Sequence, residues 1–262
     1  MRVEFDKEIK LLLVPHYGPI RLIYGRKWIV HMIISHAHQF IFLKTQKCAG
    51  TSVELALSQL CGPDDVITRV TPGDEELRIG RKPQNYSIPH CYRPPLWRLW
   101  LALGMRPSRA GTSYYNHMGA AALRRAMDPA LFDAYRKVTV VRNPWDREVS
   151  LYYWTYRDNP NPPDFERFVS RYRYRPERKT FEIYSISGRI VADVILRYER
   201  LQADFEEFVA SLGVKDCPEL PRAKGQHRKS ANRDYRKMYN NRTRRIVERR
   251  YAREIEAFGY EF

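Results

Sequence analysis

Short apolar runs alternate along the chain with longer stretches in which apolar residues recur at helical spacing. The run from Gln39 to Lys44 is typical of a buried strand. The β-branched run Lys137–Val141 (KVTVV) predicts a second strand, and Val191–Tyr198 is a third candidate. After the first run, apolar side chains at positions 53, 55, 56, 57 and 60 follow a helical period.

Helical patterns also follow the other two candidate strands. Asn143 can cap a helix that has Pro144 at its first position and continues through WDREVSLYYWTYR. The stretch ERLQADFEEFVASLG predicts another helix, which ends at Gly213. Two further helical patterns lie at 117–135, interrupted at Pro129, and at 233–258, where Arg244–Glu248 and Arg250–Glu254 spacings indicate an exposed face.

This order of elements predicts an α/β fold in which a parallel sheet is flanked by helices on both faces. We expect one domain over residues 32–262, since no linker divides it. Residues 1–31 fit the pattern poorly, and we interpret them as a leader of unclear role.

Composition narrows the choice of partner and compartment. The 262 residues carry a net charge of +16, which favours an anionic partner: nucleic acid, a membrane surface, an acidic polysaccharide or a phosphate-rich cofactor. The four cysteines form no CxxC pair, so we expect free thiols in a reducing compartment. No run reaches the roughly 20 apolar residues of a membrane span, and the charged first ten residues are unlike a secretory signal. These features predict a cytoplasmic protein.

The turn between the first strand and its helix reads KTQKCAGTS and has the residues of an anion site. A helix N-terminus offers unpaired N–H groups and a partial positive charge, and Gly50 lets an anion approach the backbone. Lys47 adds a charge, and Thr51 and Ser52 add hydroxyl groups. The alternative is an ordinary capped turn. The loop is not a Walker A motif, because its lysine precedes the glycine, and this disfavours a metal-dependent NTPase.

A second anion-binding pattern follows the second strand. Arg142 stands at the end of that strand, and Ser150 lies about two turns into the next helix. The carboxyl ends of parallel strands open on the same edge of a sheet, where ligands bind. Two such elements on one edge indicate a ligand with two separated anionic groups.

These two stretches resemble sulfotransferases that use 3′-phosphoadenosine 5′-phosphosulfate (PAPS). Lys47-x-x-Gly50-Thr51-Ser52 looks like their 5′-phosphosulfate loop, and Arg142-Asn-Pro-Trp-Asp-Arg with Ser150 looks like their 3′-phosphate motif. The resemblance is greatest to the carbohydrate branch, sulfotransferase family 2, which includes relatives of heparan sulfate 2-O-sulfotransferase. It extends over 32–262 through YYNHMGAAALR, RYERLQADFEEF and FGYEF, and it implies a P-loop-NTPase-like fold.

The resemblance also implies roles for the residues in both motifs. Lys47 would contact the bridging oxygen and the leaving phosphate, while Gly50, Thr51 and Ser52 would hold the 5′-phosphosulfate. The 3′-phosphate would be held by Arg142 and Ser150. The donor would be PAPS without a metal, and the acceptor would be a carbohydrate hydroxyl, with an acidic glycan among the options. Members commonly have threonine where this chain has Cys48, which is either a redox-sensitive thiol or a buried inert one.

The acceptor hydroxyl needs a general base, and histidine suits neutral pH. His117 is the first candidate, because it lies between the two motifs and a histidine of this region serves as base in the resembling branch. His90 is the second candidate, and a structural or capping role for His117 is the alternative. We interpret His36 and His38 as surface residues.

Two other functions fit parts of the sequence. A basic nucleic-acid-binding protein would explain the charge, but no RNA- or DNA-binding motif is present, so we expect no nucleic acid partner. A nucleotide kinase of related P-loop-like fold would need ATP and Mg²⁺. The basic segment 218–232 either closes over a nucleotide through Arg222, Lys224 or Lys229, or is a solvated face. The apolar insert 93–107 is either a short packed helix or a binding surface.

Overall fold

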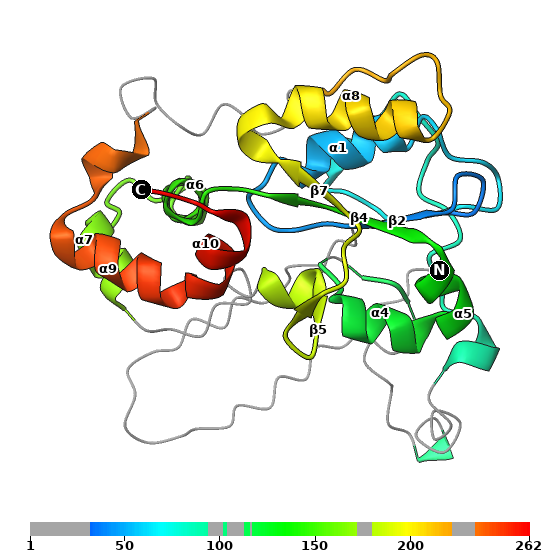
Figure 1. Ribbon diagram of the computed structural model, residues 1–262, viewed down its shortest axis with the longest axis horizontal. Helices are drawn as coiled ribbons and strands as arrows, with labels where there is room; N and C mark the ends of the chain where they lie inside the picture. Colours follow the sequence, from blue (N-terminus) through cyan, green and yellow to red (C-terminus); the bar gives the residue numbers. More distant parts are fainter. Residues whose placement is uncertain (1–31, 94–101, 104–112, 116, 172–179, 222–233) are drawn as a thin grey trace, which may run out of the picture.

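A mixed five-stranded sheet runs through the centre of the chain (Figure 1). The computed structural model describes residues 32–93, 102–103, 113–115, 117–171, 180–221 and 234–262. The leader, most of the apolar insert and Arg222, Lys224 and Lys229 lie outside these residues. In spatial order the strands are β3 (Val66–Ile67), β1 (Ile33–Ser35), β2 (Phe40–Leu43), β4 (Arg136–Val141) and β7 (Val194–Arg197).

The three strands predicted from sequence are parallel, and of the two further strands only β1 runs in the opposite direction. β2 pairs with β4, and β4 pairs with β7, both in parallel register. The prediction of a parallel sheet is wrong for β1, which runs antiparallel to both of its neighbours, β2 and β3. The turn between β1 and β2 spans only residues 36–39, which is too short for the crossover that a parallel pair requires. The α/β class is confirmed.

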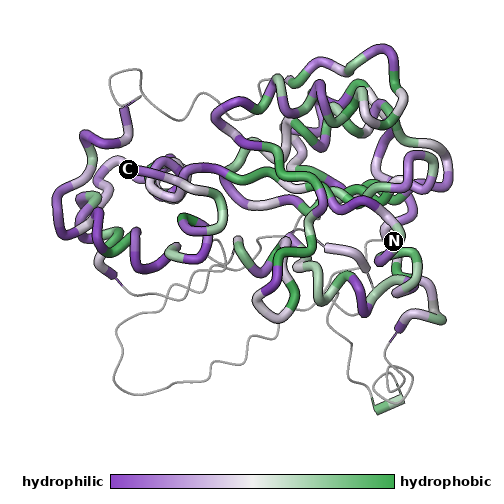
Figure 2. The backbone as a smooth tube through the Cα atoms, viewed as in Figure 1, coloured by the Kyte–Doolittle hydropathy of each residue, from purple (hydrophilic) through white to green (hydrophobic). Residues whose placement is uncertain are grey.

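Alternating side chains of the strands face two separate layers of helices. Phe40 and Phe42 belong to a cluster with α1 (Gly50–Leu57) and α8 (Leu201–Ser211). Ile41 and Leu43 face the opposite side, where α4 (Ala120–Ala126) and α5 (Pro129–Ala134) lie. Figure 2 shows the hydrophobic strands between the helical layers. The β2–α1 loop lies at the carboxyl edge of the parallel strands, because it follows the last residue of β2.

A second group of helices lies beyond the sheet edge, around α6 (Pro144–Thr155) (Figure 1). Asn143 caps α6 as predicted, since its side chain accepts hydrogen bonds from the Trp145 and Asp146 amides. α6 packs on α7 (Phe165–Ser170), α9 (Asn241–Arg250) and the 3-10 helix η8 (Tyr235–Met238), and α9 is followed by α10 (Ala252–Phe258).

The prediction of one long helix over 233–258 is wrong, and the exposed face predicted for it is only partly correct. The segment is divided into η8, α9 and α10, with a break at Tyr251. Glu254 is buried and pairs with Arg147 of α6 rather than with Arg250, and Arg250 pairs with buried Glu148. The i,i+4 spacing indicated solvent-exposed pairs because the sequence gives no sign of partners about 100 residues earlier.

Smaller elements complete the described chain. They are α2 (Pro72–Glu75), a β-hairpin of β5 (Ser185–Ile186) and β6 (Arg189–Ile190), and the 3-10 helices η1 (His90–Tyr92), η4 (Phe181–Ile183) and η5 (Tyr198–Arg200). In the part of the chain that the structure describes, none of the helices has the length and apolar character needed to cross a bilayer.

Candidate functional site

The loop between β2 and α1 has an unusual backbone. Lys47 and Ala49 both adopt left-handed conformations, with φ of 61° and 58°. Ala49 is the N-cap of α1, and no side chain caps the helix there. The first-turn amides of α1 therefore point out of the helix end without a capping acceptor, and alternating left-handed residues curve such amides into an anion-binding concavity. This backbone fits an anionic group.

Gly50 is required by packing rather than by its backbone angles. A Cβ built on Gly50 would lie 2.7 Å from Cγ of Lys44 and 3.3 Å from the Thr45 carbonyl oxygen. We expect Gly50→Ala to lower the free energy of unfolding by about 1–3 kcal/mol, because the added methyl overpacks the loop. Urea unfolding would measure this, with Gly73→Ala as control, since a Cβ at Gly73 meets nothing within 4 Å. Equal effects of the two substitutions would contradict this packing explanation.

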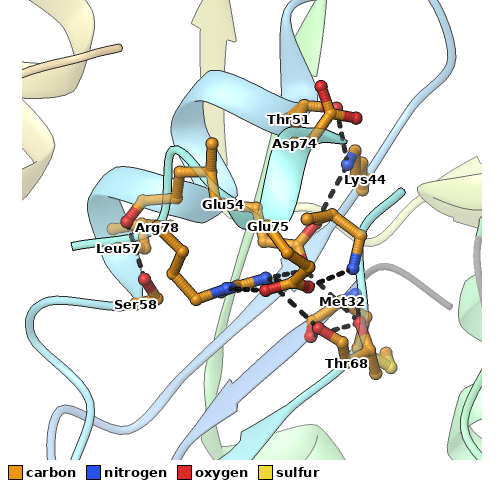
Figure 3. Close-up of polar contacts among 12 residues, drawn as sticks. Met32, Lys44, Thr51, Glu54, Leu57, Ser58, Thr68, Asp74, Glu75 and Arg78 are labelled. Atoms are coloured by element: carbon orange, nitrogen blue, oxygen red, sulfur yellow. Dashed lines mark hydrogen bonds and ion pairs between the residues drawn. The ribbon is translucent and has the colours of Figure 1, made fainter. Parts of the chain in front are cut away.

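Lys44 joins the end of β2 to the first turns of α1 (Figure 3). Its buried ammonium group donates to the Thr51 hydroxyl at 3.0 Å and to the Glu54 carboxylate at 2.9 Å. Glu54 is itself fully buried and lies within 3.9 Å of the Arg78 guanidinium. Because the Thr51 oxygen accepts from Lys44, its hydrogen is directed to another acceptor, such as an anion in the loop. The sequence places two lysines in this turn, but it does not distinguish this supporting lysine from Lys47.

The structure decides between the two interpretations of Cys48. The thiol is fully buried and contacts the Gln46 carbonyl oxygen at 3.2 Å. Burial raises the pKa of the Cys48 thiol, more than the nearby Arg147 and Arg142 charges lower it. Cys48 is therefore the inert thiol, and the loop tolerates it because backbone amides do not depend on that side chain.

Thiol labelling should separate the four cysteines into two pairs. Cys91 and Cys217 are exposed, whereas Cys48 and Cys61 are buried. We expect two thiols per folded chain to react rapidly with Ellman's reagent, and all four after unfolding in guanidinium. Rapid labelling of Cys48 in the folded protein, located by mass spectrometry, would contradict this assignment.

Arg142 joins the second predicted motif to the loop. One guanidinium nitrogen, Nη1, donates to the Lys47 carbonyl oxygen at 2.8 Å. Nε donates to Asp146 at 2.8 Å, and Nη2 lies 2.6 Å from the same carboxylate. The guanidinium stacks on the Tyr198 ring, 3.8 Å from its centroid. Ser150 lies half-buried in α6, two turns after Arg142. The two motifs therefore meet at the carboxyl edge of β2 and β4.

The start of α6 is held by two other segments. The Asn143 amide nitrogen donates to Glu199 at 2.6 Å, and its side-chain nitrogen donates to the Glu261 carbonyl oxygen at 2.8 Å. Both contacts join residues that are distant in the sequence. They explain why FGYEF lies beside the motif that starts at Arg142.

His117 lies at the same edge as the loop. Its Nδ1 is 2.7 Å from the Lys44 carbonyl oxygen, and His117 itself has a left-handed φ of 53°. A carbonyl oxygen can only accept, so Nδ1 carries the proton and Nε2 is the basic nitrogen of the neutral ring. His117 precedes α4 rather than lying in a helix. His90, the other candidate, begins η1, and its role stays a prediction.

Trp154 is a site residue that the motifs do not include. The Lys47 ammonium lies over its ring, 5.2 Å from the centroid, and the Arg157 guanidinium lies at the same distance. Trp154 lies on α6 one turn after Ser150, and that spacing is the signal that could have indicated it. Among the residues that the structure describes, no three His, Cys, Asp or Glu side chains are grouped so as to hold a metal ion.

Comparisons with known proteins identify the family of the chain. Residues 30–261 match the family described as the sulfotransferase family. A solved structure described as a sulfotransferase from Alicyclobacillus acidocaldarius shares 18% identity, with 86% of this chain and 96% of that chain covered and a TM-score of 0.42. The comparison with curated proteins finds no match.

Proposed function

The chain belongs to the sulfotransferase family, and we propose that it transfers the sulfuryl group of PAPS to a hydroxyl of a carbohydrate acceptor by in-line displacement. The observation that carries this proposal is the meeting of two anion-binding elements at one sheet edge, through the 2.8 Å bond from Arg142 to the Lys47 carbonyl. A ligand with two separated anionic groups, such as PAPS, fits such a pair. Four unpaired cysteines support a cytoplasmic setting as part of the same proposal.

The loop would hold the 5′ end of the donor. The uncapped amides of α1 and the hydroxyls of Thr51 and Ser52 offer N–H and O–H donors, and Lys47 offers a positive charge. PAPS, when bound, supplies the sulfuryl group and a phosphate leaving group. Donors that are already in place for the charge that develops on that phosphate stabilise the transition state. In this proposal lysine and backbone groups carry the charge, so no metal is required.

The 3′ end would be held by Arg142 and Ser150. Arg142 is buried with its orientation fixed by Asp146 and Tyr198, so its guanidinium is prepared for a phosphate oxygen before a ligand arrives. Ser150 adds a hydroxyl donor from α6, the helix that follows Arg142. This pair would select a nucleotide with a 3′-phosphate.

His117 is the proposed general base, and replacement by asparagine tests this role most directly. The Asn side-chain nitrogen can donate to the Lys44 carbonyl as Nδ1 does, but it cannot accept a proton. We expect His117→Asn to lower kcat about 10²- to 10⁴-fold while the affinity for 3′-phosphoadenosine 5′-phosphate (PAP) stays unchanged. Steady-state kinetics and titration calorimetry measure the two quantities. His38→Asn is the control. An unchanged kcat for His117→Asn would contradict this role for His117 and leave His90 as the candidate general base.

The donor proposal is tested by calorimetric titration with PAP at moderate salt and without magnesium. The wild type should bind PAP at one saturable site that ATP does not match, and Lys47→Ala and Arg142→Ala should weaken binding. Absence of PAP binding would overturn the proposal. Binding that depends only on ionic strength would favour the nucleic-acid alternative, and a requirement for ATP and Mg²⁺ would favour the kinase alternative.

A carbohydrate acceptor is supported by the aromatic ring beside Lys47. The half-buried Trp154 lies against the cation that is proposed to contact the leaving group, and aromatic faces can pack on the apolar faces of sugar rings. Arg157, on the same ring, would suit an acidic sugar. Screening neutral and acidic oligosaccharides for PAPS-dependent PAP release tests this part, and release only with non-carbohydrate hydroxyls would overturn it.

A further inference from the structure

Arg142 bonds to the backbone of Lys47, one of the two residues in the loop that have a left-handed conformation. Its Nη1 donates to the Lys47 carbonyl oxygen at 2.8 Å, and Lys47 has a φ of 61°. A left-handed backbone is unfavourable for a residue with a long side chain and persists only where its surroundings hold it. We propose that Arg142 has a second task beyond the 3′-phosphate: it is a positioning residue that holds the 5′-phosphosulfate loop in its binding conformation. This inference rests on the proposed function.

Two side chains hold Arg142 itself in place. Asp146 binds Nε and Nη2 at 2.8 and 2.6 Å, and Tyr198 lies beneath the guanidinium plane at 3.8 Å. With one edge and one face of the guanidinium fixed, the remaining Nη1 is directed at the loop. Asp146 and Tyr198 thus act on the loop through Arg142, and we infer the same positioning task for them.

One arginine can carry both tasks at once. A guanidinium has five N–H donors. Its contacts with Lys47 and Asp146, among the residues that the structure describes, use at most three of them. At least two N–H groups are left for a phosphate oxygen. Lysine, with a single nitrogen on a flexible stem, cannot make this set of contacts.

The test compares ligands with and without a 3′-phosphate. Adenosine 5′-phosphosulfate (APS) lacks that phosphate, so a residue that only binds the 3′-phosphate cannot affect its affinity. We expect Arg142→Lys to weaken APS binding about tenfold or more, the loss expected for one charge-assisted hydrogen bond. Ser150→Ala, by contrast, should weaken binding of PAP and leave APS binding unchanged. Calorimetry with both ligands gives the ratio of the APS and PAP affinities for each variant. A general loss of folding would lower both affinities together and leave this ratio unchanged.

Asp146→Asn gives a second test. The substitution should change the affinity for APS in opposite directions, depending on whether Asp146 acts only through its charge or by holding Arg142. Removal of an acidic group near an anion site should strengthen anion binding if only charge matters. If Asp146 acts by holding Arg142, the substitution should weaken APS binding, and Tyr198→Leu should do the same. Thermal unfolding of each variant would verify that it is folded.

The binding measurements distinguish failure of the positioning task from failure of the proposed function. Weaker APS binding in Arg142→Lys and Asp146→Asn supports the positioning task. Unchanged APS binding in Arg142→Lys, or tighter binding in Asp146→Asn, overturns it while PAP binding by the wild type still supports the proposed function. If the wild type binds neither PAP nor APS, the proposed function itself fails.

Discussion

Lys47→Ala should lower the rate of sulfuryl transfer about 10²- to 10³-fold, which is the loss typical of removing one prearranged donor to a developing charge. The leaving phosphate gains negative charge as the bond to sulfur breaks, and in our proposal the Lys47 ammonium is the positive charge in contact with that phosphate. Since this contact strengthens in the transition state, the loss should appear mainly in kcat and less in the affinity for PAP. Single-turnover release of PAP from PAPS would measure it.

The control for this prediction is Lys215→Ala. Lys215 is exposed and follows α8, which runs back from the carboxyl edge of the sheet, so its loss removes the same charge away from the site. Lys47→Arg should recover part of the rate, because the charge remains but its position changes. If Lys47→Ala changes the rate no more than Lys215→Ala, Lys47 has no role in the transfer.

Glu254→Gln should lower the free energy of unfolding by about 3–5 kcal/mol, the cost of leaving one partner of a buried ion pair uncompensated. Glu254 accepts from Arg147 at 2.9 and 2.7 Å, and also from Thr180 and Tyr184. Both charged groups are buried, so with glutamine at this position the Arg147 charge would stay inside the protein without a compensating negative charge. Urea unfolding at neutral pH would measure the change, and Glu256→Gln on the exposed side of α10 is the control.

The same pair predicts a dependence on pH. Burial on its own would raise the pKa of Glu254, but the Arg147 charge and the hydrogen bonds outweigh it and hold that pKa below its ordinary value. A carboxyl group whose pKa is lower in the folded state stabilises the fold above the unfolded pKa, and this contribution is lost as the pH falls through the folded pKa. The difference between wild type and Glu254→Gln should therefore shrink in acid. A difference that grows in acid would contradict the lowered pKa.

Local patterns allowed much of the site to be predicted. The strand–loop–helix at Gly50 and the Asn143 cap depend on neighbouring residues, so the sequence indicated both. The role of Lys44 beneath Thr51 depends on how the loop folds back, and the contact of Arg142 with Lys47 depends on the pairing of β2 with β4. The second of these contacts joins residues 95 positions apart, and no local period encodes it.

The strands that the sequence missed are very short. β1 has three residues and β3 has two, which is too few for a period of two to stand out from chance. The antiparallel pairing of β1 with β2 follows from the four-residue turn between them. Glu254, the buried acid of α10, was misassigned for a different reason. A charged residue four positions from an arginine is usually exposed, and only the tertiary partner on α6 changes that expectation.

The attachment of α6 to α9 and α10, by one ion pair to each, has a consequence for motion. Arg147 and Glu254 join segments 107 residues apart, and Arg250 and Glu148 are separated by 102. Segments held together by such contacts tend to open as one cooperative unit. The amide hydrogens of α6, including those beside Ser150, should therefore exchange with deuterium at the same rate as those of α10. Local loosening of α10 would then reach the proposed 3′-phosphate site without any contact between α10 and the ligand.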